Sequence, residues 1–300
     1  MKILVTGVNG QLGHDVVNEL VKRGHTPIGS GSAPTCSDTL KAEIRYAQMN
    51  ITDSDQVMHT VEYLRPDAVI HCAAWTNVDG AEDAENVPKV FAVNEEGTRN
   101  LARACKRYDS KLLYISTDYV FNGQGTEPWQ PDCKAFEPLN VYGASKLAGE
   151  TAIAETLERF FIVRIAWVFG INGKNFIKTM LNLGKTHESL RVVNDQIGTP
   201  TYTYDLARLL VDMIETEKYG YYHATNEGGY ISWADFAAEI FRQAGMPTKV
   251  IPVTTEEYGL SKARRPFNSR LDKRKLSESG FAPLPDWKDA LSRYLEELNR

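Results

Sequence analysis

Three regularly spaced glycines near the start of the chain constrain its fold more than any other feature. Gly7, Gly10 and Gly13 follow the apolar run at residues 3–5, and apolar side chains then recur at helical spacing over residues 12–21. This order predicts a buried strand, a tight turn and an amphipathic helix. Glycine lets the backbone approach a pyrophosphate, and the free N–H groups of a helix N-terminus attract one. The pattern therefore predicts a dinucleotide-binding βαβ unit.

Further short apolar runs follow through the first half of the chain, and the segments between them are long enough for helices. Parallel strands need such crossover connections. We therefore predict a Rossmann-type α/β fold, in which helices cover both faces of a doubly wound parallel sheet. Beyond the first strand, the predicted strands are residues 26–29, 46–51, 68–72, 111–115 and 161–167.

The second half of the chain has a different pattern. Polar segments that contain glycine interrupt the predicted strands and helices at residues 170–173 and 195–200. A short apolar run at residues 221–224 is expected to return to the main sheet as a strand. The predicted helices are residues 205–215, residues 233–244 with Ser232 as N-cap, and residues 286–299.

These changes predict two regions. The dinucleotide-binding Rossmann domain is expected to comprise residues 1–168, with about 202–226 returning to it. A smaller, discontinuous substrate-binding region is expected at about 169–201 and 227–300. Ligands of open α/β sheets bind outside the carboxyl ends of the strands, so we expect the smaller region to lean over that edge.

The composition excludes several classes of function. With 34 Lys plus Arg against 39 Asp plus Glu, the net charge is −5, which argues against nucleic acid as a partner. A membrane span needs about 20 apolar residues, whereas the apolar stretch at residues 68–75 is short and contains His71. The chain opens directly on a strand, so we expect no signal peptide. Four scattered cysteines without a CxxC pair fit a reducing cytoplasm and predict no metal site.

The end of the second predicted strand bears on the choice of cofactor. NAD-binding folds of this kind usually place an acidic residue there to hold the ribose 2′-hydroxyl. This chain has Gly29-Ser30-Gly31-Ser32 instead, without a carboxylate that would repel a 2′-phosphate. The sequence therefore favours NADPH and leaves NADH open.

A hydroxyl, a phenol and an amine form the candidate catalytic set. Thr117 follows the strand predicted at residues 111–115, and Tyr142 and Lys146 are four residues apart, so a helix brings both to one face. An ammonium beside a phenol is expected to lower the pKa of the phenol, which could then exchange a proton near neutral pH. The Thr117 hydroxyl could hold the carbonyl of a substrate.

The motifs together resemble one enzyme family. The stretch Ser-Thr-Asp-Tyr-Val-Phe at residues 116–121 and the pattern Asp-Gln-x-Gly-x-Pro-Thr at residues 195–201 are far more specific than the glycine turn. With these, the chain resembles the extended short-chain dehydrogenases/reductases and, among them, the dTDP-4-dehydrorhamnose reductases. The other matching stretches are residues 6–13, 73–79, 138–143, 146–150, 164–170 and 265–269, so the resemblance spans nearly the whole chain.

The resemblance implies a reaction. Members of this family reduce the C4 keto group of dTDP-4-dehydro-6-deoxy-L-mannose to dTDP-L-rhamnose, a precursor of cell-surface polysaccharide. It implies an NAD(P)H cofactor, a nucleotide-sugar substrate and a cytoplasmic enzyme, and it leaves a homodimer open. It also implies roles for residues. The catalytic set would be Thr117, Tyr142 and Lys146.

The same resemblance implies the binding residues. Lys146 would also hold the nicotinamide ribose, and Trp167 would pack on the deoxysugar. The residues implied at the cofactor are Gly7, Asn9, Gly10, Gln11, Leu12, Gly13, Asn50, Ile51, Ala73, Ala74, Tyr142 and Lys146. Those implied at the substrate are Thr117, Tyr119, Tyr142, Trp167, Gln196 and Arg265.

Three alternatives were weighed on the residues. A nucleotide-sugar 4,6-dehydratase would carry a second carboxylate after Asp118, where this chain has Tyr119. A C4 epimerase of the same superfamily is not excluded by motif. A dinucleotide-binding regulatory subunit, like that of methionine adenosyltransferase, would not need the intact catalytic set. Some relatives are described as binding Mg²⁺ through acidic residues, but the nearest counterpart here is Asp15 at a helix start, and we predict no required metal.

Overall fold

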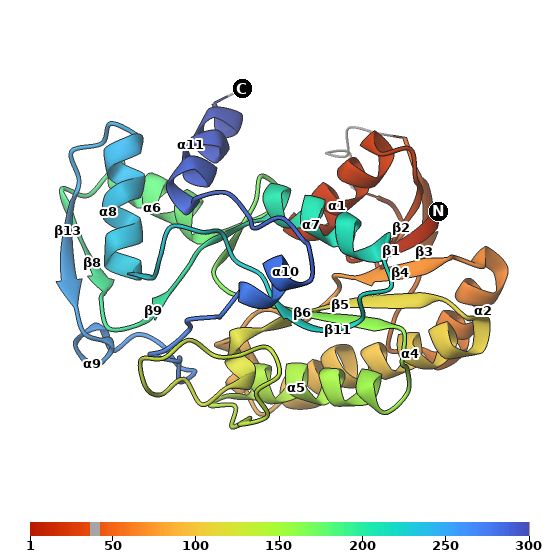
Figure 1. Cartoon of the computed structure of the whole chain (residues 1–300). Helices are drawn as coiled ribbons and strands as arrows, with labels where there is room; N and C mark the ends of the chain where they lie inside the picture. The colour runs from red at the N-terminus through yellow and green to blue at the C-terminus, as the bar shows by residue number, and fades with distance from the viewer. Residues whose placement is uncertain (37–42, 300) are drawn as a thin grey trace.

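The computed structural model describes residues 1–36 and 43–299, and its centre is a seven-stranded parallel sheet. The strand order is β11-β6-β5-β4-β1-β2-β3, so the direction of winding reverses between β1 and β4. Each neighbouring pair runs parallel. Figure 1 shows the sheet between α1 and α7 on one side and α2, α4 and α5 on the other. The strands of this sheet are β1 (Lys2–Thr6), β2 (Thr26–Gly31), β3 (Arg45–Gln48), β4 (Ala68–His71), β5 (Lys111–Thr117), β6 (Phe160–Ile165) and β11 (Gly220–His223).

Helices cover both faces of this sheet because both faces are apolar. In β1, Ile3 and Val5 pack with helices α1 and α7 on one face, whereas Leu4 packs with α2 and α4 on the other. This alternation places a separate core on each side of the sheet. The helices of the two layers are α1 (Gln11–Lys22), α2 (Ser54–Leu64), α4 (Gly97–Tyr108), α5 (Val141–Ala154), α7 (Thr203–Ile214) and α10 (Arg274–Glu278).

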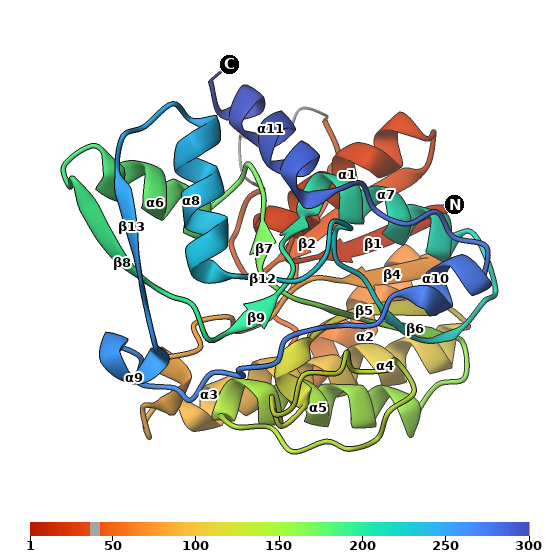
Figure 2. The ribbon, with the colours of Figure 1, turned by 60° about the vertical axis from the view of Figure 1, so that its left-hand side comes forward.

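A second cluster of elements stands beyond the carboxyl ends of the strands (Figure 2). Its core is rich in aromatic side chains, among them Phe169, Phe236, Trp287 and Tyr294. It comprises α6 (Phe176–Gly184), β8 (Ser189–Val193), α8 (Trp233–Gln243), β13 (Lys249–Val253) and α11 (Trp287–Leu298). We call these five elements the upper lobe.

Short elements lie between these longer helices and strands. They are η1 (Gly80–Glu82), α3 (Val87–Phe91), the π-helical turn η2 (Ala92–Glu96), η3 (Asp118–Val120), β7 (Val168–Phe169), β9 (Ile197–Gly198), β10 (Thr201–Tyr202), β12 (Ile231–Ser232) and α9 (Thr255–Tyr258). Among the described residues, none of the helices has the length and apolar character needed to cross a bilayer.

The predicted fold class is confirmed, and some predicted bounds need correction. The third strand is shorter than the predicted residues 46–51, and the sixth ends at Ile165, before Trp167, whose backbone is left-handed at φ 50°. Residues 221–224 return to the sheet as predicted, and Ser232 caps α8 with a capping box. The parallel pairing of β8 with β13 was not anticipated. The division into two domains at the predicted residues remains a prediction.

Candidate active site

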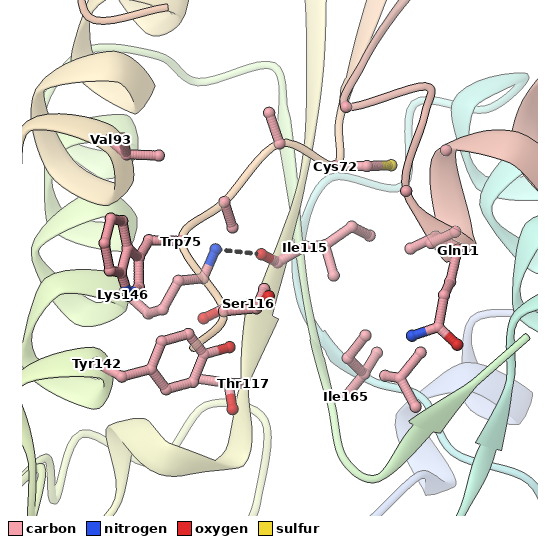
Figure 3. A pocket seen from close by; sticks show the side chains of 18 of the residues that line it. Gln11, Cys72, Trp75, Val93, Ile115, Ser116, Thr117, Tyr142, Lys146 and Ile165 are labelled. Atoms are coloured by element: carbon pink, nitrogen blue, oxygen red, sulfur yellow. Dashed lines mark hydrogen bonds between the residues drawn. The ribbon is translucent and has the colours of Figure 1, made fainter. Parts of the chain in front are cut away.

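A cavity of about 980 Å³ opens at the carboxyl ends of the strands, where the winding of the sheet reverses between β1 and β4. The sheet supplies one wall, and the upper lobe supplies the other through Phe176, Trp233 and Phe236. This is the position at which open α/β sheets bind their ligands, because adjacent loops turn in opposite directions there. Figure 3 shows the part of the cavity around Tyr142 and Lys146.

The glycine turn forms a cradle that side chains would fill. Gly7 has φ 68°, and a Cβ there would lie 2.7 Å from the backbone nitrogen of Ala73. A Cβ on Gly13 would lie 2.3 Å from the carbonyl oxygen of Gly7. Gly10 is the N-cap residue of α1, and because it has no side chain it cannot accept a hydrogen bond from the first N–H groups of the helix. The exposed backbone and the helix N-terminus together suit a pyrophosphate.

The cradle is tied to the segment that leads into the upper lobe. The Gln11 side chain accepts hydrogen bonds from the backbone nitrogen of Gly170 at 2.9 Å and from Asn175 at 3.1 Å. Asn172 donates to the carbonyl oxygen of Asn9 at 2.9 Å. These bonds join residues that lie 159, 163 and 164 positions apart in the sequence. A ligand on the cradle would therefore contact a surface that both parts of the molecule hold in place.

The end of β2 lies in the same cavity and carries no carboxylate. Ser30, Ser32 and Ala33 line it, and the Ser30 hydroxyl is buried without a hydrogen-bond partner. Tyr46 donates to the carbonyl oxygen of Ala33 at 2.6 Å and so shapes this turn. Asn50 and Ile51, predicted near the adenine, line the cavity, as do Ala73 and Ala74 after β4.

The three candidate catalytic side chains converge on this cavity from two elements. Thr117 ends β5, and Tyr142 and Lys146 occupy successive turns of α5, whose N-cap Asn140 accepts a hydrogen bond from the backbone of Gly143 at 2.8 Å. The Thr117 hydroxyl lies beside the Tyr142 phenol and acts to lower its pKa. Figure 3 shows both hydroxyls pointing into the same space.

Lys146 is held away from bulk water. Its Nζ donates to the carbonyl oxygen of Ile115 at 2.7 Å, the dashed line in Figure 3, and lies 3.9 Å from the ring centre of Tyr114. Burial lowers the pKa of Lys146 to about 7, although the carboxylate of Glu150 opposes this shift. The amine therefore changes its charge near neutral pH.

The phenol does not behave as the spacing predicted. We expected Lys146 to lower the pKa of Tyr142, but burial of the phenol raises this pKa above its ordinary value, and the neighbouring Thr117 hydroxyl only partly opposes the rise. The physical reason is that a buried phenolate loses its hydration. Tyr142 accordingly keeps its proton at neutral pH.

Aromatic side chains form the wall opposite this set. Trp167 and Trp233 stack with ring centres 3.8 Å apart, and Phe176 lies 4.6 Å from Trp233. The left-handed backbone of Trp167 turns the chain between β6 and β7, and a Cβ on Gly198 would lie 3.0 Å from the Trp167 ring. This wall is apolar and flat, which suits a sugar face that carries few hydroxyls.

Charged and phenolic groups close the outer end. Arg265 binds Asp79 at 2.7 Å and donates to the Tyr119 hydroxyl at 3.3 Å. Tyr119 in turn packs edge-on against Tyr142, with ring centres 5.7 Å apart. Burial raises the pKa of Tyr119 to about 12, so its hydroxyl stays neutral.

The structure brings all the predicted site residues but one to the cavity. Gln196 is the exception: its side chain is buried and donates to the Thr255 hydroxyl at 3.0 Å, away from the cavity lining. Gln196 joins the 195–201 loop to α9 through this bond, and its role at the substrate remains a prediction. Residues that the sequence analysis missed include Trp75, Phe176 and Trp233, and only their aromatic character could have suggested them.

Comparison with known proteins identifies the family. Residues 1–300 match the family model described as RmlD substrate binding domain. The dTDP-4-dehydrorhamnose reductase of Streptomyces griseus is 40% identical over 98% of this chain and 93% of its own length. This chain belongs to the dTDP-4-dehydrorhamnose reductase family.

Two further relatives extend this result. The spore coat polysaccharide biosynthesis protein SpsK of Bacillus subtilis is 39% identical over 99% of this chain and 97% of its own. The crystal structure of dTDP-4-dehydrorhamnose reductase from Bacillus anthracis, a complex with NADP, matches with a TM-score of 0.89 and 40% identity over 99% of each chain. The resemblance drawn from the motifs is thus confirmed.

Proposed function

We propose that this protein is an NADPH-dependent oxidoreductase that reduces the C4 keto group of dTDP-4-dehydro-6-deoxy-L-mannose and forms dTDP-L-rhamnose. The observation that carries the proposal is the convergence of Thr117, Tyr142 and Lys146 on one cavity that also contains the glycine cradle, with Tyr142 and Lys146 one turn apart on α5. The family to which the chain belongs supports the choice of substrate.

The chain's own groups would handle the proton. Tyr142 keeps its phenolic proton at neutral pH and donates it to the carbonyl oxygen as the C4–O double bond becomes a single bond. Thr117 hydrogen-bonds the same oxygen and stabilises the charge that develops there. Lys146, anchored on the Ile115 carbonyl, orients the phenol and holds the nicotinamide ribose. When bound, the reduced nicotinamide supplies the hydride that adds to C4.

The proposed binding role of each residue follows from where that residue lies in the cavity. The glycines of the cradle and the backbone at residues 9–12 would hold the pyrophosphate, and Asn50 with Ile51 would border the adenine. Trp167 would pack on the deoxysugar, while Tyr119 and Arg265 would face the rest of the nucleotide sugar.

The cofactor preference rests on the end of β2. Residues 29–32 include no carboxylate to repel a 2′-phosphate, so NADPH is accommodated and NADH is not excluded. The NADP complex of the relative from Bacillus anthracis supports the same choice. SpsK, by its name, supports a role in making surface polysaccharide. The four scattered cysteines, which form no CxxC pair, support a cytoplasmic location. Light scattering would test for a homodimer.

The test is a coupled measurement of cofactor and sugar. The purified protein is mixed with dTDP-4-dehydro-6-deoxy-L-mannose and either NADPH or NADH, and loss of the reduced-nicotinamide absorbance is followed while chromatography identifies the sugar. We expect oxidation of the cofactor in step with formation of dTDP-L-rhamnose, faster with NADPH.

A double variant is the control for mechanism. Tyr142→Phe with Thr117→Val should abolish turnover and retain NADPH binding, because both groups act on the carbonyl oxygen and not on the cradle. Absence of oxidation by the unaltered protein, shown to bind cofactor, would refute the assigned substrate. Retained turnover in the double variant would refute the assigned proton donor.

A further inference from the structure

A buried carboxyl group that the proposed reaction does not use lies next to Thr117. Asp118 begins the turn η3, and its side chain is 2% exposed. The Thr117 hydroxyl donates to Asp118 Oδ1 at 3.1 Å. Asp118 Oδ2, by contrast, is buried without any hydrogen-bond partner. An ionised carboxylate has two acceptor oxygens, so leaving one of them dry favours the neutral acid.

Because of the hydrogen bonds around Thr117, the charge of the Asp118 carboxyl group decides whether the Thr117 hydroxyl can donate to a substrate. The Thr117 hydroxyl has one proton and two lone pairs. The backbone nitrogen of Tyr119 donates to it at 3.3 Å, which occupies one lone pair. If Asp118 is ionised, the single proton of Thr117 must point at Oδ1, and Thr117 offers the substrate only a lone pair. If Asp118 is neutral, its own O–H can donate to Thr117, and the Thr117 proton is free.

We infer that Asp118 is a positioning residue whose neutral carboxyl group leaves the Thr117 hydroxyl free to donate to the carbonyl oxygen that is reduced. The inference rests on the proposed function, because it concerns that same oxygen. Ionised Asp118 would turn Thr117 into an acceptor, which neither polarises a carbonyl nor stabilises an alkoxide. Asp118 lines the cavity beside Thr117, but its Oδ2 is covered by protein, and we therefore assign its effect on the substrate to its hydrogen bond with Thr117.

The surroundings of Asp118 allow this change of charge in the working pH range. Burial raises the pKa of Asp118 to about 6, although Ser269 and the hydrogen bond from Thr117 oppose the rise. The titratable groups that interact with it are the phenols of Tyr119, on the same turn, and Tyr142, on α5.

Two cations of the cavity, Lys146 and Arg265, are engaged with other partners. Lys146 on α5 donates to the Ile115 carbonyl, and Arg265, from the segment after α9, binds Asp79 and Tyr119. Neither makes a salt bridge with Asp118 that would hold the carboxylate in its charged form. Asp118 is therefore neutral below about pH 6 and ionised above it.

The experiment is the pH profile of kcat for four proteins with saturating NADPH and keto sugar: the unaltered chain, Asp118→Asn, Thr117→Val and the double variant. We expect kcat of the unaltered chain to fall about tenfold for each pH unit above the titration of Asp118, because the competent neutral form becomes scarce. The amide in Asp118→Asn donates at every pH, so this fall should be absent. It should also be absent in Thr117→Val, which lowers kcat about 10²–10³-fold by removing the donor.

Two comparisons separate this effect from others. Lys146 titrates in a neighbouring range, but a fall caused by Lys146 would persist in Asp118→Asn and in Thr117→Val. Persistence of the fall in either variant would overturn the inference. So would a further loss on adding Asp118→Asn to Thr117→Val, because Asp118 is inferred to act only through Thr117. If Asp118→Asn does not fold, judged by NADPH titration, the comparison with Thr117→Val alone decides.

The two proposals fail in different ways. If the unaltered chain oxidises no cofactor with the keto sugar at any pH, the proposed function fails. If it turns over with a pH profile that Thr117→Val leaves unchanged, only the role of Asp118 fails.

Discussion

Replacing Glu150 by alanine is expected to destabilise the protein by about 3–5 kcal/mol, because it leaves a buried guanidinium without its counter-ion. Glu150, on α5, binds Arg164 of β6 through Nε at 2.9 Å and through Nη2 at 2.7 Å. The Glu150 carboxylate also accepts the Ser116 hydroxyl at 2.5 Å. The two charged side chains are 1% and 2% exposed, so water cannot replace either partner.

The size of this effect follows from what remains around Arg164. After the change, the guanidinium keeps the carbonyl oxygen of Pro131 at 2.9 Å and the ring of His223 at 3.4 Å, and neither carries a negative charge. A loss of about 3–5 kcal/mol is a large part of the roughly 5–15 kcal/mol by which domains are stable. For a chain of 300 residues, the thermal midpoint should therefore fall by roughly 5–8 °C.

Two further variants test the reasoning. Glu150→Met combined with Arg164→Met should recover at least half of the lost stability, because apolar side chains can replace a buried ion pair at little net cost. Glu62→Ala removes a matched pair on the surface, where Arg65 and Glu62 are 60% and 54% exposed, and should cost under about 1 kcal/mol.

Urea unfolding followed by circular dichroism measures these changes as shifts of the midpoint at constant slope. A loss under about 1 kcal/mol for Glu150→Ala would show that the pair does not hold α5 to the sheet. A double variant as unstable as the sum of its single changes would show that the two charges are not coupled.

Two other predictions concern the cradle and a buried histidine. Gly13→Ala should weaken NADPH binding more than about tenfold, because its Cβ would lie 2.3 Å from the Gly7 carbonyl oxygen and push the cradle apart; a fluorescence titration that finds unchanged affinity would contradict this. His71 is hydrogen bonded between Thr6 and Thr98, and burial lowers its pKa from 6.5 to about 3. Between these two pH values the unfolded chain binds a proton that the folded chain does not, so the protein loses stability as the pH falls from 6.5 to about 3. The pH slope of the unfolding free energy should be about 1.4 kcal/mol per unit steeper than in His71→Asn, and equal slopes would show that His71 is not held neutral.

Local pattern was enough for the parts of this protein that depend on neighbours in the chain. The run at residues 3–5, the glycine turn and the helix after it follow from apolar periodicity and glycine spacing, and α1 spans Gln11–Lys22 as that periodicity indicates. The convergence of Tyr142 and Lys146 follows from the four-residue spacing of a helix face. Strands joined by helices, in turn, predicted the parallel order of the sheet.

Features that depend on distant residues required the tertiary structure. Gln196 lies within a family motif, yet its partner is Thr255, and no local signal shows that the side chain is buried there. The residues that pair between β8 and β13 also lie far apart in the sequence. The wall of Trp167 and Trp233 likewise joins two segments that no periodicity connects.

The ionisable groups of the site show the same division between what the sequence determines and what the tertiary structure determines. The sequence by itself determined which ionisable groups the site contains, because Tyr142, Lys146 and Asp118 are set by motif and spacing. It could not determine their charges: the four-residue spacing suggested an acidified phenol, whereas burial raises the pKa of Tyr142 and lowers that of Lys146. A pKa depends on how much water the whole fold removes from a group and on which donors it leaves nearby, and only the packed structure decides both.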